Sequence, residues 1–262
     1  MIITDNNYID KARFSDALDT YRSSKNTDSG NSIGTLGEKS LHAVLKRYYE
    51  PDSSRHEVAV GDYVADIVGE EGIIEIQTRN FSRLKPKLGG LLELCRVTVV
   101  HPVIVSRRII NIDGLTGEVV SVRTSPKHGS LYTEMRELYT LRDILTSDNL
   151  TMKFPLLTAH EFRTYGVKTR RRKKQRTKKG EYVSDVIPTD IIDEITLSES
   201  CDYSVLIPDG LPEQFGAKEF AAAAATDATN ARMAINLLVR MKLAKPVEKK
   251  GNRIVYTLVA PI

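Results

Sequence analysis

Apolar and polar positions alternate in two different ways along the first third of the chain. Between residues 35 and 49 apolar side chains recur every three or four positions, as on one face of a helix, and Pro51 ends that pattern. Residues 56–60 and 61–78 are instead rich in β-branched residues, with turn residues at 61–62 and 69–72. The pattern predicts a helix followed by three antiparallel strands.

The pattern then returns to helical spacing over residues 82–96, followed by a valine-rich run at 97–105 that is typical of a buried parallel strand. Pro102 predicts either a bend or a strand start within that run. We expect a short helix at 14–21, a hairpin over 107–124, a helix over 130–145 and β structure over 151–165. Residues 1–165 are thus predicted to form an α/β (α+β) domain, a mixed sheet flanked by helices.

The remaining 80 or so residues carry a different pattern. We expect residues 191–207 to be mostly helical, and 217–225 and 229–243 to form two further helices. A hairpin over 246–258 follows, with Lys249 and Lys250 at its tip. Three helices and a basic hairpin are similar to a winged helix-turn-helix domain, here assigned to residues 183–262.

Charge changes this picture at one place. The chain of 262 residues has a net charge of +4, but the segment 168–179 holds nine basic residues and no acid, which leaves −5 on the rest. We interpret residues 166–182 as a basic linker between two domains. A solubilising spacer is the alternative, but clustered like charges favour contact with a polyanion, which releases counterions.

Composition places the chain among ordinary globular proteins. Two distant cysteines, Cys95 and Cys201, predict a reducing cytoplasm and no zinc site. The sequence has no apolar run of membrane length, so we expect no membrane partner. A homodimer is left open.

Two carboxylates are predicted to face each other on the second and third strands. A turn centred between Glu70 and Glu71 pairs residue i with residue 141 − i, so Asp66 lies opposite Glu75. Alternation then places Asp66, Glu75 and Gln77 on one face of the sheet. Like charges in direct opposition destabilise a sheet, and a divalent cation between them would remove the conflict.

Asp66 and the run Glu75-Ile76-Gln77 resemble the core motif of the PD-(D/E)XK nucleases, the fold of restriction endonucleases and Holliday-junction resolvases. The resemblance covers residues 35–105 and departs from the family in Ala65, which precedes the aspartate, and in Gln77, which replaces the lysine. It implies Mg²⁺ or Mn²⁺ held by Asp66, Glu75 and the Ile76 carbonyl, and catalysis that also involves Gln77.

Two further acids each have two interpretations. Glu38 is a candidate catalytic acid, because the helix before the sheet often supplies one in this fold; it also fits a capping box that begins at Thr35. Glu57, opposite Asp66 in the first hairpin, is either another acid beside the metal or an exposed strand residue.

The sequence therefore favours a metal-dependent nuclease that acts on nucleic acid, with duplex DNA as the preferred substrate. A degenerate nuclease fold that serves as a DNA-binding regulator or scaffold is the main alternative, and a transcription factor with an unrelated N-terminal sensor is a third. The residues expected to contact nucleic acid lie after the third strand, in the basic segment, on the last helix and at the hairpin tip: Arg79, Arg170, Arg171, Arg172, Lys173, Lys174, Arg176, Asn230, Arg232, Asn236, Lys249 and Lys250.

Overall fold

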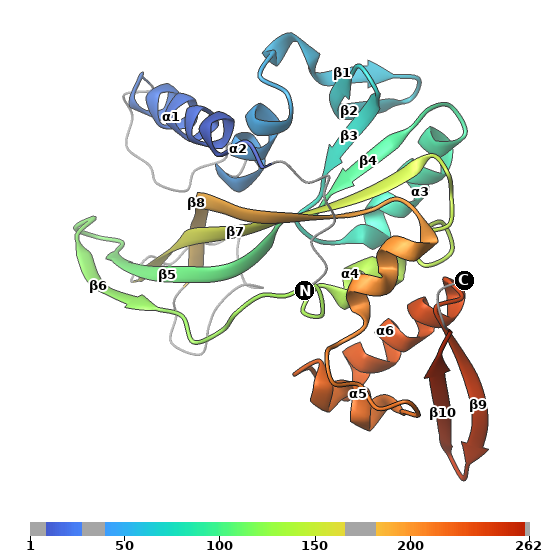
Figure 1. The fold of residues 1–262 in the computed structure, drawn as a ribbon. Helices are drawn as coiled ribbons and strands as arrows, with labels where there is room; N and C mark the ends of the chain where they lie inside the picture. The colour runs from blue at the N-terminus through green and yellow to red at the C-terminus, as the bar shows by residue number, and fades with distance from the viewer. Residues whose placement is uncertain (1–8, 28–39, 166–181, 260–262) are drawn as a thin grey trace.

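The computed structural model describes residues 9–27, 40–165 and 182–259. A mixed eight-stranded sheet forms the centre of this part of the chain, with helices on both faces (Figure 1). Its strands are β1 (His56–Val60), β2 (Tyr63–Gly69), β3 (Gly72–Ile76), β4 (Val97–Val100), β5 (Val103–Asp113), β6 (Val119–Thr124), β7 (Leu150–Tyr165) and β8 (Tyr182–Leu197). The predicted fold class, a mixed sheet flanked by helices, is confirmed.

The long strand β7 connects two parts of the sheet. Along one edge it pairs in parallel first with β4 and then with β5, while β8 runs antiparallel to it along the other edge. β4 and β5 are successive pieces of one stretch, interrupted at His101 and Pro102. A proline lacks the amide hydrogen that a ladder needs, and β5 begins directly after Pro102, so the second of the two expectations, a strand start, is the one observed.

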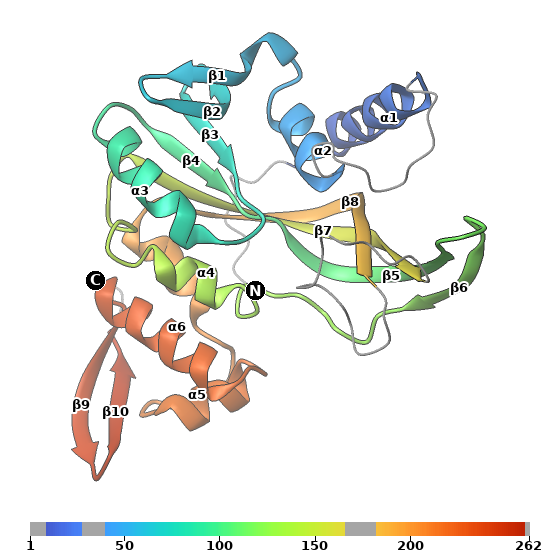
Figure 2. The ribbon, with the colours of Figure 1, turned by 180° about the vertical axis from the view of Figure 1, so that it is seen from behind.

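Helices α1 (Lys11–Thr27) and α2 (Ser40–Tyr49) cover one face of the sheet, and α3 (Phe81–Leu92) and α4 (Met135–Thr140) cover the other (Figures 1 and 2). Each face has its own hydrophobic core. Val99 packs in the core on the α3 side, whereas the next residue, Val100, packs on the α2 side, as alternation along a strand requires. The predicted helix over 130–145 is shorter than expected, with turns on both sides of α4.

The prediction of helix over residues 191–207 is wrong. Residues 182–197 form β8, and only Ser200–Leu206 is helical, as a 3₁₀ helix. Ile187, Ile191 and Ile195 recur every four residues, a spacing that suits both a helix face and every second position of a strand. The ladder with β7 contains several register shifts, which blur the simple alternation further.

β8 also corrects the domain boundaries. Because residues 182–197 pair with β7, they belong to the central sheet and not to a separate unit that begins at residue 183. The segment predicted as an interdomain linker instead connects two paired strands of one sheet, and its residues 166–181 lie outside the described part. The C-terminal unit begins after β8.

The C-terminal unit contains α5 (Ala217–Ala223), α6 (Ala228–Arg240) and the hairpin of β9 (Ala244–Lys250) and β10 (Arg253–Leu258). These elements match the sequence expectations for 217–258, with the 3₁₀ helix in place of the first α-helix. Phe215, Phe220 and Leu206 pack in the same core cluster as Met135 of α4, so the unit is joined to the sheet domain by a continuous apolar core.

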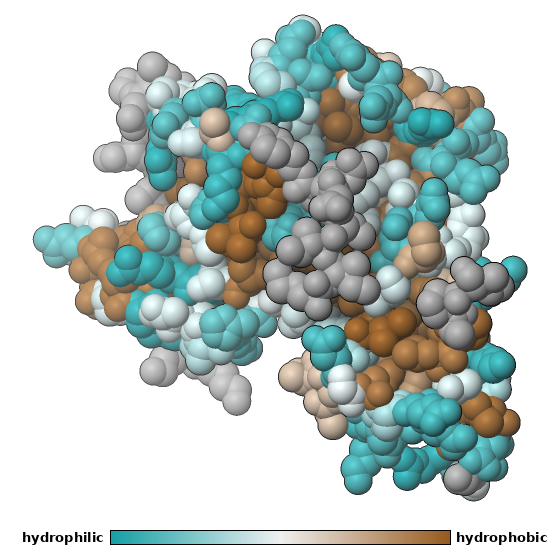
Figure 3. Space-filling view, viewed as in Figure 1, coloured by the Kyte–Doolittle hydropathy of each residue, from teal (hydrophilic) through white to brown (hydrophobic). Residues whose placement is uncertain are grey.

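β6 forms an outer edge of the sheet, with β5 as its strand partner among the described residues. All six of its residues are exposed, including Val119, Val120 and Val122. The apolar surface that they contribute lies at the β5–β6 end of the molecule (Figure 3).

Candidate functional site

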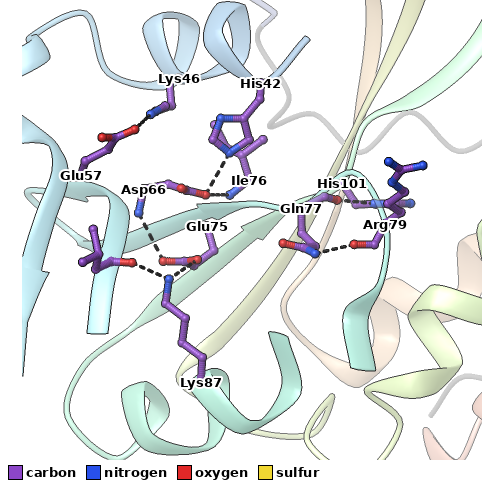
Figure 4. Close-up of polar contacts among 11 residues, drawn as sticks. His42, Lys46, Glu57, Asp66, Glu75, Ile76, Gln77, Arg79, Lys87 and His101 are labelled. Carbon is purple, nitrogen blue, oxygen red and sulfur yellow. Dashed lines mark hydrogen bonds and ion pairs between the residues drawn. The ribbon is translucent and has the colours of Figure 1, made fainter. Parts of the chain in front are cut away.

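The predicted pairing of β2 with β3 is present. Ile67 lies opposite Ile74, Val68 opposite Ile73 and Gly69 opposite Gly72, each pair summing to 141. The ladder ends at the next position, which is that of Asp66 and Glu75. There the side chains replace the ladder: the Ile76 amide donates to Asp66 Oδ2 at 2.8 Å, and the Asp66 amide donates to Glu75 Oε1 at 3.3 Å (Figure 4). The structure thus places both acids at the end of the β2–β3 ladder, where each side chain accepts a hydrogen bond from an amide of the opposite strand.

The expectation that Asp66 and Glu75 share one face does not hold. Asp66 Oδ2 lies 3.2 Å from His42 Nε2 on α2, whereas Glu75 Oε2 lies 2.6 Å from Lys87 Nζ on α3. The reason is an irregularity in β2. Ala65 packs in the core on the α3 side and Ile67 in the core on the α2 side, although regular alternation would put them on the same side. Asp66 sits at this transition, so its carboxylate turns toward α2 while its backbone stays beside Glu75.

The surroundings of Asp66 favour its ionised form. Burial raises the pKa of this carboxyl, but the hydrogen bond and charge of His42, the Ile76 amide and the charge of Lys87 outweigh burial and lower it below its ordinary value. A carboxylate that remains ionised at this position is suited to bind a cation or to hold His42 in place.

The surroundings of Glu75 act in the opposite direction. Only 3% of this residue is exposed, and burial raises its pKa above the ordinary value despite the hydrogen bond from Lys87. The nearby charge of Asp66 raises it further. Two neighbouring carboxyls whose pKa values are displaced apart are a feature of functional sites more often than of plain sheet surface.

Lys87 is the main residue that sequence reasoning missed. Its ammonium group contacts the carboxylate of Glu75 and also donates to the Val64 carbonyl at 2.6 Å, so it bridges the two strands from α3 (Figure 4). The available signal was the predicted β3–helix–β4 crossover, which packs the helix back over β3. A lysine near the middle of that helix can therefore reach the acids of the preceding strand.

Gln77 does not contact either acid. Its side-chain amide donates to the carbonyl of Arg79, and its backbone carbonyl lies beside the ring of His101 (Figure 4). Arg79 is exposed just before α3. The position of the motif lysine is thus occupied by a side chain that stabilises its own turn.

A second basic contact lies on the α2 side. Lys46, with its side chain only 4% exposed, places Nζ 2.9 Å from Glu57 Oε1. Glu57 has a positive φ of 54°, an unfavourable conformation for a residue with a side chain. The first hairpin has the expected register, and Glu57 is exposed and ion-paired, which matches the simpler of its two interpretations.

The other predicted residues divide into two groups. On α6, Arg232 and Asn236 are exposed, whereas Asn230 is half-buried and donates to Asp227 at the start of the helix. Lys249 is exposed on β9, and Lys250 ends that strand. Glu38 and the basic residues 170–174 and 176 lie outside the described residues.

The residues at the gap where the β2–β3 ladder ends offer a hard divalent cation a small number of oxygen ligands. Mg²⁺ is commonly held by one or two carboxylates with waters in the remaining positions, and Asp66, Glu75 and the carbonyl of Ile76 supply that kind of oxygen ligand. Within residues 9–27, 40–165 and 182–259, no group of three or more His, Cys, Asp or Glu side chains is placed to hold a metal. The gap therefore suits a two-carboxylate site and not a closed protein cage.

The fold and this gap define a mixed α/β protein with a pair of carboxylates at the end of a β-ladder. The chain belongs to the family described as a domain of unknown function, DUF8091, which matches residues 39–198. It is also similar to an uncharacterized protein of Treponema pallidum (strain Nichols), with 31% identity over 232 residues that span 87% of this chain and 88% of that protein. No solved structure matches the chain. The matched segment ends one residue after β8, which agrees with the start of the C-terminal unit.

No helix in the described part of the chain is both long and apolar enough to cross a membrane.

Proposed function

We propose that this protein is a metal-dependent nuclease that hydrolyses phosphodiester bonds in nucleic acid, with duplex DNA as its preferred substrate. The observation that supports the proposal best is the meeting of Asp66 and Glu75 where β2 and β3 separate. Like charges this close repel each other, and both acids remain at this position although each needs a basic partner, His42 or Lys87, beside it. The resemblance of this segment to the PD-(D/E)XK core suggests metal binding as the role of the pair.

In the proposed site Asp66, Glu75 and the Ile76 carbonyl would hold Mg²⁺ or Mn²⁺ at the end of the ladder, where the two acids adjoin although their carboxylates turn to opposite faces. The ion would polarise the phosphate and lower the pKa of an attacking water. Lys87 supplies the positive charge that Gln77 lacks, because its Nζ already lies 2.6 Å from Glu75. His42 keeps the Asp66 carboxylate oriented through their 3.2 Å contact. Gln77 shapes the turn that leads to α3.

The C-terminal unit is proposed to bind nucleic acid as a winged helix. α5 and α6 form a pair of helices joined by a short turn, and the hairpin of β9 and β10 follows as the wing. Arg232 and Asn236 on α6 and Lys249 on β9 are exposed and free of the core. The basic segment would add affinity that does not depend on sequence.

The decisive experiment is a cleavage assay with Mg²⁺ or Mn²⁺ on duplex, single-stranded and branched DNA and on RNA. We expect cleavage by the wild type and none by Asp66→Ala, because loss of this ligand removes the metal. Lys87→Gln should lower the rate about a hundredfold or more, as loss of a charge-stabilising group does. Combining Lys87→Gln with Gln77→Lys should restore part of that loss, since a lysine at position 77 returns a positive charge two residues after Glu75.

Calorimetry with Mn²⁺ gives a second readout that does not depend on turnover. Binding should disappear in a variant that carries both Asp66→Asn and Glu75→Gln, which keep the shapes of the side chains and remove their charges. Lys87→Gln serves as the control that disturbs the same gap and leaves both carboxylates. Metal binding that is unchanged in the double variant, or no Asp66-dependent cleavage of any substrate, would contradict the proposal.

A regulator or scaffold that binds nucleic acid without cutting it is the second candidate. The observation that favours it is the side chain of Gln77, which bonds to the Arg79 backbone and not to the acids. This candidate predicts nucleic-acid binding that is equal in the wild type, Asp66→Ala and Gln77→Lys, with no cleavage by any of them.

A further inference from the structure

We infer that exposed arginines on three neighbouring helices form one binding surface for the phosphate backbone of a duplex, running from the candidate site to α6. The surface consists of exposed side chains just before α3 and on α3, α4 and α6: Arg79, Arg83, Arg136 and Arg232. The inference rests on the proposed function for its ligand and specifies where that ligand lies.

The surface begins beside Lys87. Arg83 precedes Lys87 by one helical turn, so the two side chains lie on the same side of α3. Lys87 contacts Glu75 in the candidate site, and Arg83 is exposed beyond it. Arg79 is exposed immediately before the helix. A backbone phosphate bound beside Glu75 would therefore have Arg83 next to it.

The surface continues onto α4 at the start of α3. The amides of Asn80 and Phe81 donate to the carboxylate of Glu137 at 3.0 and 2.8 Å, so α4 lies directly beside the N-terminus of α3. Arg136 precedes Glu137 and is exposed. The charge of Glu137 is thus directed toward the amides of α3, and that of Arg136 toward solvent.

Asp227 connects α4 to α6. Its carboxylate caps α6 by accepting from the amides of Thr229 and Asn230, and these hydrogen bonds are the first reason that its pKa is lowered. The charges of Arg136 on α4 and Arg232 on α6 lower it as well. One carboxylate thus lies within electrostatic reach of both arginines. Figures 1 and 2 show the same order, with α4 between α3 and α6.

These arginines differ from two others nearby, one just after α4 and one on α6. Arg142 and Arg240 both pair with Asp143, whereas Arg79, Arg83, Arg136 and Arg232 have no ion-pair partner among residues 9–27, 40–165 and 182–259. Asp227 attracts Arg136 and Arg232 without forming an ion pair with either. Exposed guanidinium groups with no carboxylate in ion-pair contact suit phosphate groups, which they can bind with two parallel hydrogen bonds. Because the row extends over three helices, a continuous polyanion fits it better than a single phosphate.

The test compares two double variants with equal loss of charge in a binding assay without metal, so that cleavage plays no part. One variant carries Arg83→Gln and Arg136→Gln. The control carries Arg108→Gln and Arg123→Gln, two exposed arginines on β5 and β6 at the other end of the sheet. Fluorescence anisotropy would be measured over a range of salt with labelled duplexes of about one and about three helical turns.

We expect the first variant to reduce the slope of log affinity against log salt by about one to two, and the control to leave the slope unchanged. The wild type should bind the longer duplex more tightly than the shorter one, and the first variant should lose most of that difference. Equal slopes of log affinity against log salt for the two variants would overturn the proposed binding surface. Competition by polyglutamate as strong as that by duplex would assign the row to an acidic protein and overturn the nucleic-acid ligand. Failure of the cleavage assay would leave this result unaffected.

Discussion

At the scale of single residues, His101 fixes the segment behind the candidate site. It is 1% exposed, and its two ring nitrogens lie beside the carbonyl of Gln77 and, at 3.1 Å, beside Glu134 Oε2. Its ring also packs edge-on against Phe81 at the start of α3. The chain from Gln77 to α3 therefore depends on one buried imidazole and the acid that pairs with it.

Glu134→Gln should reveal that dependence through pH. Burial raises the pKa of Glu134, but the hydrogen bond and charge of His101, the Thr133 hydroxyl and the charge of Arg107 outweigh it and lower the pKa. A lowered pKa adds stability above the unfolded value of about 4.3, and this stability is lost as pH falls through the folded value. Urea unfolding should show the wild type more stable by about 1.5–3 kcal/mol at pH 7, with the difference shrinking as pH falls below about 4.3 and lost once pH is below the folded pKa. A difference that does not change with pH would contradict this account.

Among the site residues, Asp66 and Glu75 could be found from sequence because a hairpin's register follows from its turn. For Lys87 the sequence indicated only the crossover helix after β3, and for His42 it gave no signal, because both positions depend on how two helices pack on opposite faces of the sheet. The orientation of Asp66 toward α2 could not be predicted either, because the irregularity in β2 is not visible in the alternation of apolar and polar residues.

At the scale of elements, the connection from β2 to β3 depends on Gly72. Its φ is +131°, and a Cβ atom at this position would lie 2.3 Å from the backbone oxygen of Arg96. The same oxygen accepts a hydrogen bond from the Ile73 amide at 3.0 Å, so it is held against the start of β3. The position therefore excludes a side chain for two separate reasons.

Gly72→Ala should destabilise the protein by at least about 2 kcal/mol more than Gly61→Ala, as measured by thermal or urea unfolding. Gly61 is the matched control, because it also has a positive φ, +57°, but no atom lies within 4 Å of the added Cβ. Its substitution should cost roughly 1 kcal/mol from backbone conformation alone. Similar losses for the two variants would show that Arg96 can move aside.

Elements bounded by clear turn or capping residues were predictable from the sequence, and those without such residues were not. The hairpins of β2–β3 and β5–β6 have glycine turns between alternating strands, and α6 begins at the capping residue Asp227. β8 has a strand partner, β7, on the far side of the basic segment, so the pairing that makes it a strand is not visible in local sequence.

At the scale of the whole molecule, β7 and β8 hold the two halves of the chain together. β7 pairs with β4 and β5 of the first half, and β8 leads directly into the C-terminal unit. The chain connects these strands through residues 166–181, while their own ladder runs from Met152 and Leu197 to Thr164 and Tyr182. The two strands are therefore held together by a long noncovalent ladder as well as by the chain that connects them.

Residues 1–173 and 174–262, produced together as two polypeptides, should consequently copurify as a folded pair. The measurement is recovery of the untagged half with a tag on the other, followed by a thermal unfolding transition of the eluted pair. Ile195→Pro in the second polypeptide is the control, because proline removes an amide from the strand opposite Phe154 and should prevent recovery. Failure to recover the untagged half from the unmodified pair would show that the covalent connection between β7 and β8 is essential.

The same ladder makes the molecule a natural candidate for fragment complementation. If the two polypeptides assemble only when β7 meets β8, then each half is inert until the other arrives, and assembly can be placed under external control. At concentrations too low for the halves to associate on their own, fusing them to a pair of domains that dimerise on addition of a drug would assemble the intact sheet at a chosen moment. Any activity that requires both the Asp66–Glu75 gap and α6 would then begin at that moment, which makes its dependence on the assembled molecule directly observable in time.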